Sequence, residues 1–179
     1  RHMAIDKLRD NEERWQFALE GSGEGVWDWN IETGESLYSK RWKQMFGFAD
    51  DEIGNTSSEW SSRVHPDDLP KVMLAIQAHI DGEAPSIATE YRMRCKDGSW
   101  LWTIGRGMVV ARSIEGRAIR LVGTNTDISE RKRIEEALYE EKEFFHLIAE
   151  SIEDYIAVLD LEGRRLYNSP AYMALFGTN

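Results

Sequence analysis

The sequence contains one cysteine, Cys95, among its 179 residues. A single thiol cannot form an intrachain disulfide, and few cysteines are typical of proteins that work in a reducing compartment. Long hydrophobic runs are also missing, because no stretch reaches the roughly 20 apolar residues that a membrane-spanning helix requires. No signal peptide is recognisable. We therefore expect a cytoplasmic localisation, with no membrane contact by this segment.

The sequence has fewer basic than acidic residues. The 22 lysine and arginine residues stand against 32 aspartate and glutamate residues, so the net charge at pH 7 is −10. A surface for nucleic acid or for an anionic membrane needs a basic stripe, because phosphate contacts dominate the affinity. We therefore expect no nucleic-acid partner.

Motifs of catalysis are missing as well. The sequence has no nucleophile beside a base, no glycine-rich phosphate loop and no metal-ligand spacing. We expect a sensor or interaction domain and not an enzyme, with no catalytic residues and no metal site.

The cluster most easily mistaken for chemistry is His65, Pro66, Asp67 and Asp68. An imidazole beside two carboxylates suits metal binding or proton transfer. Proline in a first helical turn, with carboxylates that complement the helix dipole, is the simpler interpretation. An apolar stripe at helical spacing follows directly, so the cluster predicts a helix over residues 66–81.

The sequence contains a long internal repeat. Residues 15–47 recur as residues 145–177, with Trp15 matching Phe145 and Phe46 matching Phe176. A period of this length belongs to a domain and not to a solenoid unit. Excluding residues 1–3 as a cloning scar, we expect four segments: an N-terminal amphipathic helix to residue 20, a domain over 21–128, a helical linker over 129–151 and the truncated start of a second domain over 152–179.

The order of elements predicts an α+β fold. Apolar and aromatic alternation indicates strands, whereas three- and four-residue apolar spacing indicates helices. The helices fall in the middle of the sequence, so we expect a five-stranded antiparallel sheet with helices over one face. The expected strands cover 26–31, 35–38, 87–95, 100–111 and 118–128, and the main helices cover 40–48 and 66–81.

Six motifs in this order resemble a PAS domain with its C-terminal PAC motif. They are Gly25–Asn30, Arg41–Gly47, His65–Asp68, Glu90–Arg94, Lys96–Ser99 and Gly123–Lys132, within roughly residues 14–133. Residues 144–177 resemble the start of a second PAS domain. The resemblance implies a bacterial sensory-box module that binds a small ligand, a cofactor or nothing, and signals through a helical linker. The most similar subgroup often precedes GGDEF-type cyclic-di-GMP domains and sometimes histidine kinases.

The linker has the pattern of a coiled coil. Residues 129–151 lack glycine and proline, and an apolar seam with one polar exception at Glu141 runs along them. The N-terminal helix repeats this seam, with Leu8 matching Leu138. We expect a homodimer through these helices; the alternative is an amphipathic helix lying on its own domain. The seam residues are Leu8, Trp15, Ile134, Leu138, Phe145 and Ile148.

The junction between the last strand and the linker is the expected relay. Ser129 is the expected N-cap of the linker helix, so a shift of the last strand would move the helix. The resemblance implies that Thr124, Asp127 and Ile128 form this hinge.

Candidate ligand-binding residues face the space between sheet and helices: Trp42, Phe46, Trp60, Met73, Ile76, Tyr91, Met93, Trp102 and Ile104. Aromatic and methionine stripes are more often packed core, so a cavity filled by its own side chains is the alternative to a ligand sensor. The seven tryptophans slightly favour that alternative.

The cofactor is left open by the sequence. Cys95 lies in a strand, not in the helix motif of cysteinyl-flavin photosensors, so we expect no such adduct. Haem needs an axial ligand, for which only His79 is loosely suitable, and we expect His79 on the surface. A flavin without an adduct remains compatible with the sequence.

Overall fold

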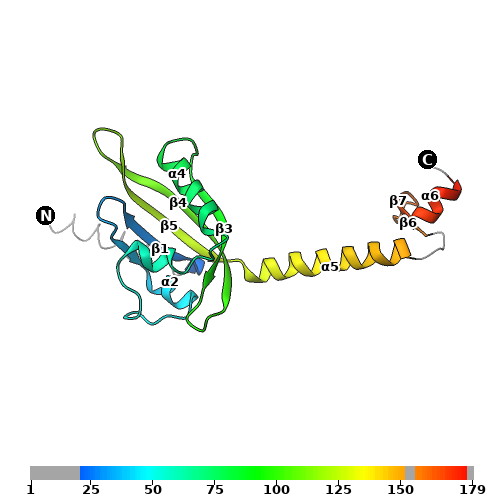
Figure 1. The fold of residues 1–179 in the computed structure, drawn as a ribbon, viewed down its shortest axis with the longest axis horizontal. Helices are drawn as coiled ribbons and strands as arrows, with labels where there is room; N and C mark the ends of the chain where they lie inside the picture. The colour runs from blue at the N-terminus through cyan, green and yellow to red at the C-terminus, as the bar shows by residue number, and fades with distance from the viewer. Residues whose placement is uncertain (1–20, 152–155, 177–179) are drawn as a thin grey trace. The chain divides into compact units, whose positions relative to one another are not determined.

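The computed structural model describes residues 21–151 and 156–176 (Figure 1). The described residues form two compact units that divide after Glu130. The predicted helix to residue 20, with Leu8 and Trp15, lies outside the described residues.

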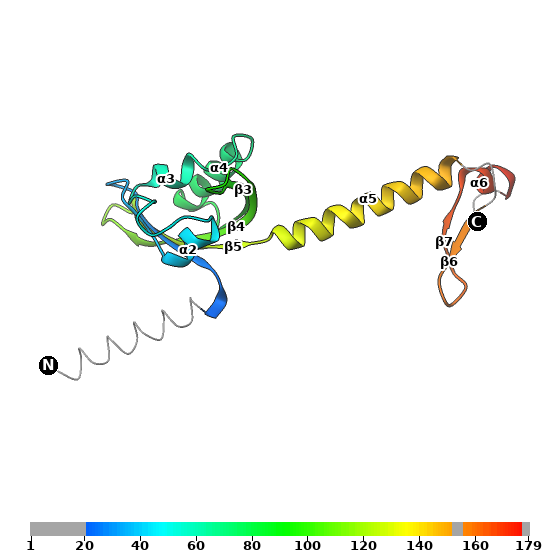
Figure 2. The same ribbon diagram turned by 90° about the horizontal axis from the view of Figure 1, so that it is seen from below.

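The first unit is built on one antiparallel sheet of five strands in the order β2-β1-β5-β4-β3. Helices cover one face of this sheet, as Figure 2 shows for α3 and α4. The predicted α+β fold with a five-stranded antiparallel sheet is therefore confirmed. The elements are β1 Gly25–Asn30, β2 Ser36–Tyr38, α2 Lys40–Met45, α3 Ser57–Ser61, α4 Leu69–Ile80, β3 Ile87–Arg94, β4 Trp100–Arg112 and β5 Ala118–Asp127.

The two faces of β3 differ as the alternation predicts. Ile87, Thr89, Tyr91 and Met93 are buried toward the helices, whereas the residues between them are more exposed. Strand β4 departs from the expected facing, because its buried residues are Thr103 and Gly105. Small residues of β4 therefore face the helices.

The register explains this departure. Tyr91 pairs with Thr103 and Arg92 pairs with Trp102, and paired residues point to the same face. The guanidinium of Arg92 lies 5.4 Å from the ring centroid of Trp102, on the face away from the core. The prediction that Trp102 and Ile104 lie on the helix-covered face was wrong, because they pair with Arg92 and Glu90 of β3, whose side chains point to the opposite face.

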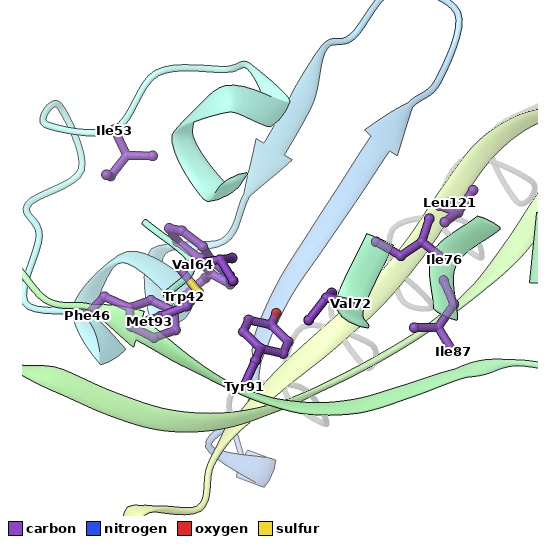
Figure 3. Close-up of a cluster of buried hydrophobic side chains, with 10 residues drawn as sticks. All are labelled: Trp42, Phe46, Ile53, Val64, Val72, Ile76, Ile87, Tyr91, Met93 and Leu121. Carbon is purple, nitrogen blue, oxygen red and sulfur yellow. The ribbon is translucent and has the colours of Figure 1, made fainter. Parts of the chain in front are cut away.

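The core lies between the sheet and α2 and α4 (Figure 3). The fully buried indole of Trp42 lies 4.3 Å from the ring of Tyr38 and 4.9 Å from that of Phe46, measured between centroids. Strand β1 approaches this helix so closely that a Cβ at Gly25 would lie 2.6 Å from Trp42 Cα. The glycine is thus required for the contact of α2 with the sheet.

Helix α4 begins three residues later than predicted, at Leu69. Asp68 precedes it without a side-chain capping bond, and its carboxylate instead accepts three hydrogen bonds from Arg92: from the backbone N at 2.9 Å, Nε at 2.9 Å and Nη2 at 2.8 Å. The carboxylate thus lies at the N-cap position of α4, as the helix-start interpretation predicts, and the guanidinium fork of Arg92 holds it there. Asp68 ties the start of α4 to the edge strand β3.

The second unit contains most of the long helix and a copy of the first hairpin. Helix α5 covers Ser129–Ser151, which confirms the predicted linker helix, and β6 Ala157–Leu159, β7 Arg165–Asn168 and α6 Pro170–Phe176 follow. Ser39 Oγ accepts a hydrogen bond from Val26 N at 2.9 Å, and Ser169 Oγ accepts the same bond from Ile156 N at 3.1 Å. The repeat in the sequence is therefore also a repeat in the hydrogen bonding.

Candidate functional site

A cavity of about 160 Å³ lies between the sheet and helices α3 and α4. Its walls are aromatic and aliphatic, and its most exposed wall residue is Met73 on α4, at 43% exposure. The cavity therefore meets solvent beside α4. The aromatic wall residues are Trp27, Trp29, Tyr38, Trp60 and Tyr91, and the aliphatic ones are Val72, Met73, Ile76, Ile87 and Leu121.

The indole of Trp27 lies flat on the sheet. A Cβ at Gly107 would come within 2.6 Å of Trp27 Cη2, and one at Gly123 would overlap Trp27 Cζ2. Strands β4 and β5 present these two glycines side by side in the sheet register. The pair leaves room for the ring, so the indole forms part of the cavity wall.

A buried hydrogen-bond network lies beside the cavity. Asn125 Oδ1 accepts from Trp42 Nε1 at 3.1 Å, and Asn125 Nδ2 donates to Tyr91 Oη at 2.9 Å and to Thr103 Oγ1 at 3.2 Å. Trp60 Nε1 donates to the same Tyr91 oxygen at 3.0 Å. Since an indole only donates, the orientation of the Asn125 amide follows from its contact with Trp42.

The cavity is uncharged at neutral pH. Burial raises the pKa of the Tyr91 phenol, and burial is also the main cause that raises the pKa of Tyr38 to about 12. Among the described residues, the cavity wall includes no aspartate, glutamate, lysine, arginine or histidine. The remaining polar wall residues are Ser36, Ser57, Ser61 and Thr89.

The predicted ligand residues fall into three groups. Trp60, Met73, Ile76 and Tyr91 line the cavity. Trp42, Phe46 and Met93 are fully buried in the adjoining core and are not among the wall residues. Trp102 and Ile104 lie on the opposite face of the sheet, as the register of β3 and β4 requires.

Sequence reasoning missed Trp27 and Trp29, which share the inner face of β1 with Gly25. Their alternation with Val26 and Asp28 was a usable signal, because residues two apart on a strand share a face. Thr89 and Gly105 were missed for another reason. Neither threonine nor glycine is a residue type that predicts a cavity wall. Only the strand register, which pairs Thr89 with Gly105, brings them together there.

His79 is not on the surface, contrary to expectation. Its side chain is buried, with Nδ1 2.8 Å from Ala84 O, and Nε2 accepts a hydrogen bond from Val109 N at 2.9 Å. Nε2 thus ties α4 to β4, Nδ1 contacts the loop after α4, and the residue is outside the cavity wall. Histidine ligation of a haem iron does not fit this arrangement.

The flavin cofactors considered from the sequence do not fit the cavity either. Cys95 lies outside the wall, and burial raises the pKa of its thiol, so no thiolate faces the space. A flavin nucleotide would also bring phosphate into a cavity without a wall cation. Within the described residues, no group of three or more His, Cys, Asp or Glu side chains could hold a metal ion.

The junction of β5 and α5 is fixed by backbone and side-chain bonds. Asp127 Oδ1 accepts a hydrogen bond from Ser129 N at 2.8 Å, and Ser129 Oγ accepts one from Trp102 N at 3.2 Å. Ile128 is buried, and its N–H donates to Trp102 O at 2.9 Å. Thr124 lies farther back on β5, paired with Arg106 on the outer face. These bonds hold Ser129, the first residue of α5, beside β4.

An antiparallel sheet that encloses an apolar cavity beneath helices, and whose last strand leads into a long helix, defines the class of the domain as α+β with a cavity between its layers. The family model described as "PAS fold" matches residues 36–125. A solved structure of a sensory box histidine kinase/response regulator from Burkholderia thailandensis is 35% identical with a TM-score of 0.65, and the match covers 74% of this chain and 97% of that one. The chain belongs to the PAS family.

Two curated relatives are longer signalling proteins. A probable diguanylate cyclase, DgcE of Escherichia coli, is 27% identical over 168 residues, which cover 92% of this chain and 15% of the relative. The sensor protein FixL of Bradyrhizobium diazoefficiens is 27% identical over 165 residues, which cover 92% of this chain and 32% of the relative. The chain therefore spans a third or less of either protein. In the described ranges, no helix is long and apolar enough to cross a bilayer.

Proposed function

We propose that this chain is a sensing and relay module of a bacterial multidomain signalling protein. The main support is strand β5, because it lines the cavity at one position and bonds to the start of the linker helix at another. Leu121 lines the cavity, Asn125 bonds to the wall residue Tyr91, and Asp127 accepts the hydrogen bond from the first turn of α5. A ligand that displaces β5 would move the start of α5.

The linker is the proposed dimer contact. Four predicted seam residues are exposed in the second unit: Ile134, Leu138, Phe145 and Ile148. Ile134 and Leu138 are more than half exposed, whereas Phe145 also contacts the ring of Tyr167 in its own chain. An exposed apolar seam at heptad spacing on a helix is suited to a second copy of the same helix. We propose a homodimer that aligns two α5 helices and transmits their rotation or change of register.

The segments on either side of this helix have proposed roles as well. Residues 21–128 are the sensing PAS/PAC domain, 129–151 the linker, and 152–179 the start of a second PAS domain. The matching bonds of Ser39 and Ser169 support the last assignment. We propose sensing and relay, and not catalysis, as the role of this chain.

The proposed output is cyclic-di-GMP turnover, with a histidine kinase as the alternative. The similarity to a probable diguanylate cyclase of Escherichia coli supports the first, and the similarity to the sensor protein FixL and to the Burkholderia sensory box histidine kinase supports the second. Either output would receive the same signal through α5.

A ligand-free relay is the second candidate. The rings of Trp27, Trp29 and Trp60 border the cavity, and bulky rings that repack leave little empty volume, which favours a cavity closed by its own side chains. Native mass spectrometry of the purified chain, with an absorption spectrum, separates the two. We expect a dimer that retains or takes up one small molecule per chain and has no visible absorption band. A dimer that takes up none would support the ligand-free relay, and a monomer would contradict the linker proposal.

A further inference from the structure

Two polar atoms in residues of the cavity wall are buried without a hydrogen-bond partner among the described residues. They are Oγ1 of Thr89 on β3 and Nε1 of Trp29 on β1. Thr89 as a whole is only 8% exposed. A buried polar group left unpaired costs about as much as a lost hydrogen bond, so each atom is a place where a ligand gains by supplying a partner.

The hydroxyl of Tyr91 adds a third donor. Its oxygen accepts from Trp60 Nε1 and from Asn125 Nδ2, and both of these groups can only donate. The lone pairs of Tyr91 are therefore engaged, whereas its own proton has no acceptor among the described residues. Because burial raises the pKa of this phenol, the proton stays in place and is available to a ligand.

Thr89 and Tyr91 are close together on the sheet. They are two residues apart on the same face of β3, which separates their Cα atoms by about 7 Å. The neighbouring position on β4 is Gly105, opposite Thr89, and a Cβ there would lie 2.9 Å from Tyr91 Oη. The absent side chain makes room for the phenol ring of Tyr91, which therefore lies over Gly105, at the strand position opposite Thr89.

The rest of the wall limits what can enter. Val72, Ile76, Ile87 and Leu121 are apolar and buried, and no charged side chain is present in the wall to compensate an ion. Desolvating an anion here would cost far more than the three donors return. The volume of about 160 Å³ is similar to that of a cavity of roughly 150 Å³ known to bind benzene.

We propose, on the basis of the sensing function above, that the ligand is a small uncharged molecule about the size of a substituted benzene ring. Its carbonyl or similar acceptor oxygen takes hydrogen bonds from the hydroxyls of Thr89 and Tyr91, while its apolar body lies against Ile76, Ile87 and the indole of Trp29. An acceptor at the far end of the molecule would also satisfy Trp29 Nε1.

Three probes test the ligand class. Acetophenone carries a carbonyl oxygen, isopropylbenzene has nearly the same shape without an acceptor, and benzoate adds a charge. Dissociation constants are measured on the full chain by titration followed through the indole N–H resonances in NMR spectra, with the Trp29 signal assigned by its loss in Trp29→Phe. We expect acetophenone to bind about tenfold more tightly than isopropylbenzene, and benzoate to bind most weakly.

Two threonine-to-valine variants test where the acceptor oxygen of the ligand binds. Thr89→Val removes an unpaired hydroxyl from the cavity, so the fold should tolerate it, and we expect it to cut the preference for acetophenone to about threefold or less. Thr124→Val makes the same change on the outer face of β5 and should keep the full preference.

The outcomes separate this inference from the sensing function. Equal binding of acetophenone and isopropylbenzene, or an unchanged preference in Thr89→Val, would overturn the acceptor site and leave an apolar sensing cavity. Tightest binding of benzoate would overturn the uncharged class. Failure of all three probes to bind up to their solubility would overturn this inference, and uptake of a different molecule in the native mass spectrum would then still support a sensor.

Discussion

The indole of Trp27 lies directly over Gly123, so a Cβ atom at this glycine would overlap the ring and the backbone oxygen of Arg106. We predict that Gly123→Ala lowers the free energy of unfolding by about 3 kcal/mol, because neither the ring nor the central strand can retreat without disturbing the sheet. Gly21→Ala is the matched control, since a Cβ there meets nothing within 4 Å. Urea denaturation of both variants measures the difference, and equal midpoints would contradict the close packing.

Asn125 is the second test of stability. Asn125→Leu retains the approximate size of the side chain but deprives Trp42 Nε1 of its acceptor in a fully buried site. We expect a loss of about 3 kcal/mol in the free energy of unfolding, because the cost of leaving buried polar groups unpaired exceeds the gain from a larger apolar side chain. The exposed Asn55 provides the control Asn55→Leu, whose thermal midpoint should stay within a degree or two of the wild type.

The ion pair of Asp68 with Arg92 predicts a dependence of stability on pH. Hydrogen bonds from Arg92 hold the pKa of the Asp68 carboxyl below its usual range. A carboxyl whose pKa is lower in the folded than in the unfolded state stabilises the fold above the unfolded value, near 4, and loses this effect as the pH falls through the folded value. We therefore expect Asp68→Asn to be less stable than the wild type at pH 7 but to lose less stability between about pH 5 and 2. Parallel acid-unfolding curves of the two proteins would contradict this assignment.

The seam of α5 predicts a change of assembly. Leu138→Lys places a charge at the centre of the proposed dimer contact, and we expect the dimer to dissociate at concentrations about 100-fold higher than for the wild type. Glu136→Gln changes the charge by the same amount on the other side of the helix and should leave the dimer intact. Sedimentation velocity across a range of concentrations measures both. A Leu138→Lys chain that dimerises like the wild type would show that the contact lies elsewhere.

Asp127 predicts a separation of binding from signalling. Asp127→Ala removes the acceptor for Ser129 N at the start of α5 but nothing from the cavity wall. We expect unchanged ligand affinity and fold, and loss of ligand control over the output of the parent protein. Asp97→Ala, in the turn between β3 and β4, is the comparison. Normal ligand regulation in the Asp127→Ala protein would rule out this carboxylate as the relay.

The elements of the fold were predictable because each has a local cause. Alternation marks β3, a glycine-free charged run marks α5, and the recurrence of residues 15–47 marks the hairpin β6–β7. The facing of β4 was not predictable in the same way. Trp102 and Ile104 are larger than Thr103 and Gly105, and only the pairing with β3 shows that the small residues face the helices.

Strand pairing alone does not predict which residues line the cavity. Apolar character correctly predicted four wall residues: Trp60, Met73, Ile76 and Tyr91. Trp42 has the same character, but its side chain is fully buried in the core and does not line the cavity. Whether a side chain borders a space or fills one depends on its neighbours in three dimensions. The unpaired hydroxyl of Thr89 depends on them too, because a threonine in a strand usually reaches a partner.

The indoles around the cavity have a practical consequence. Trp27, Trp29 and Trp60 are wall residues, so a molecule that enters displaces water or side chains from three natural fluorophores at once. Energy transfer to a bound aromatic ketone would quench them, whereas an aliphatic guest would shift their emission toward the blue. The protein thus carries its own optical reporter of occupancy, and a compound library can be screened against it without any attached dye.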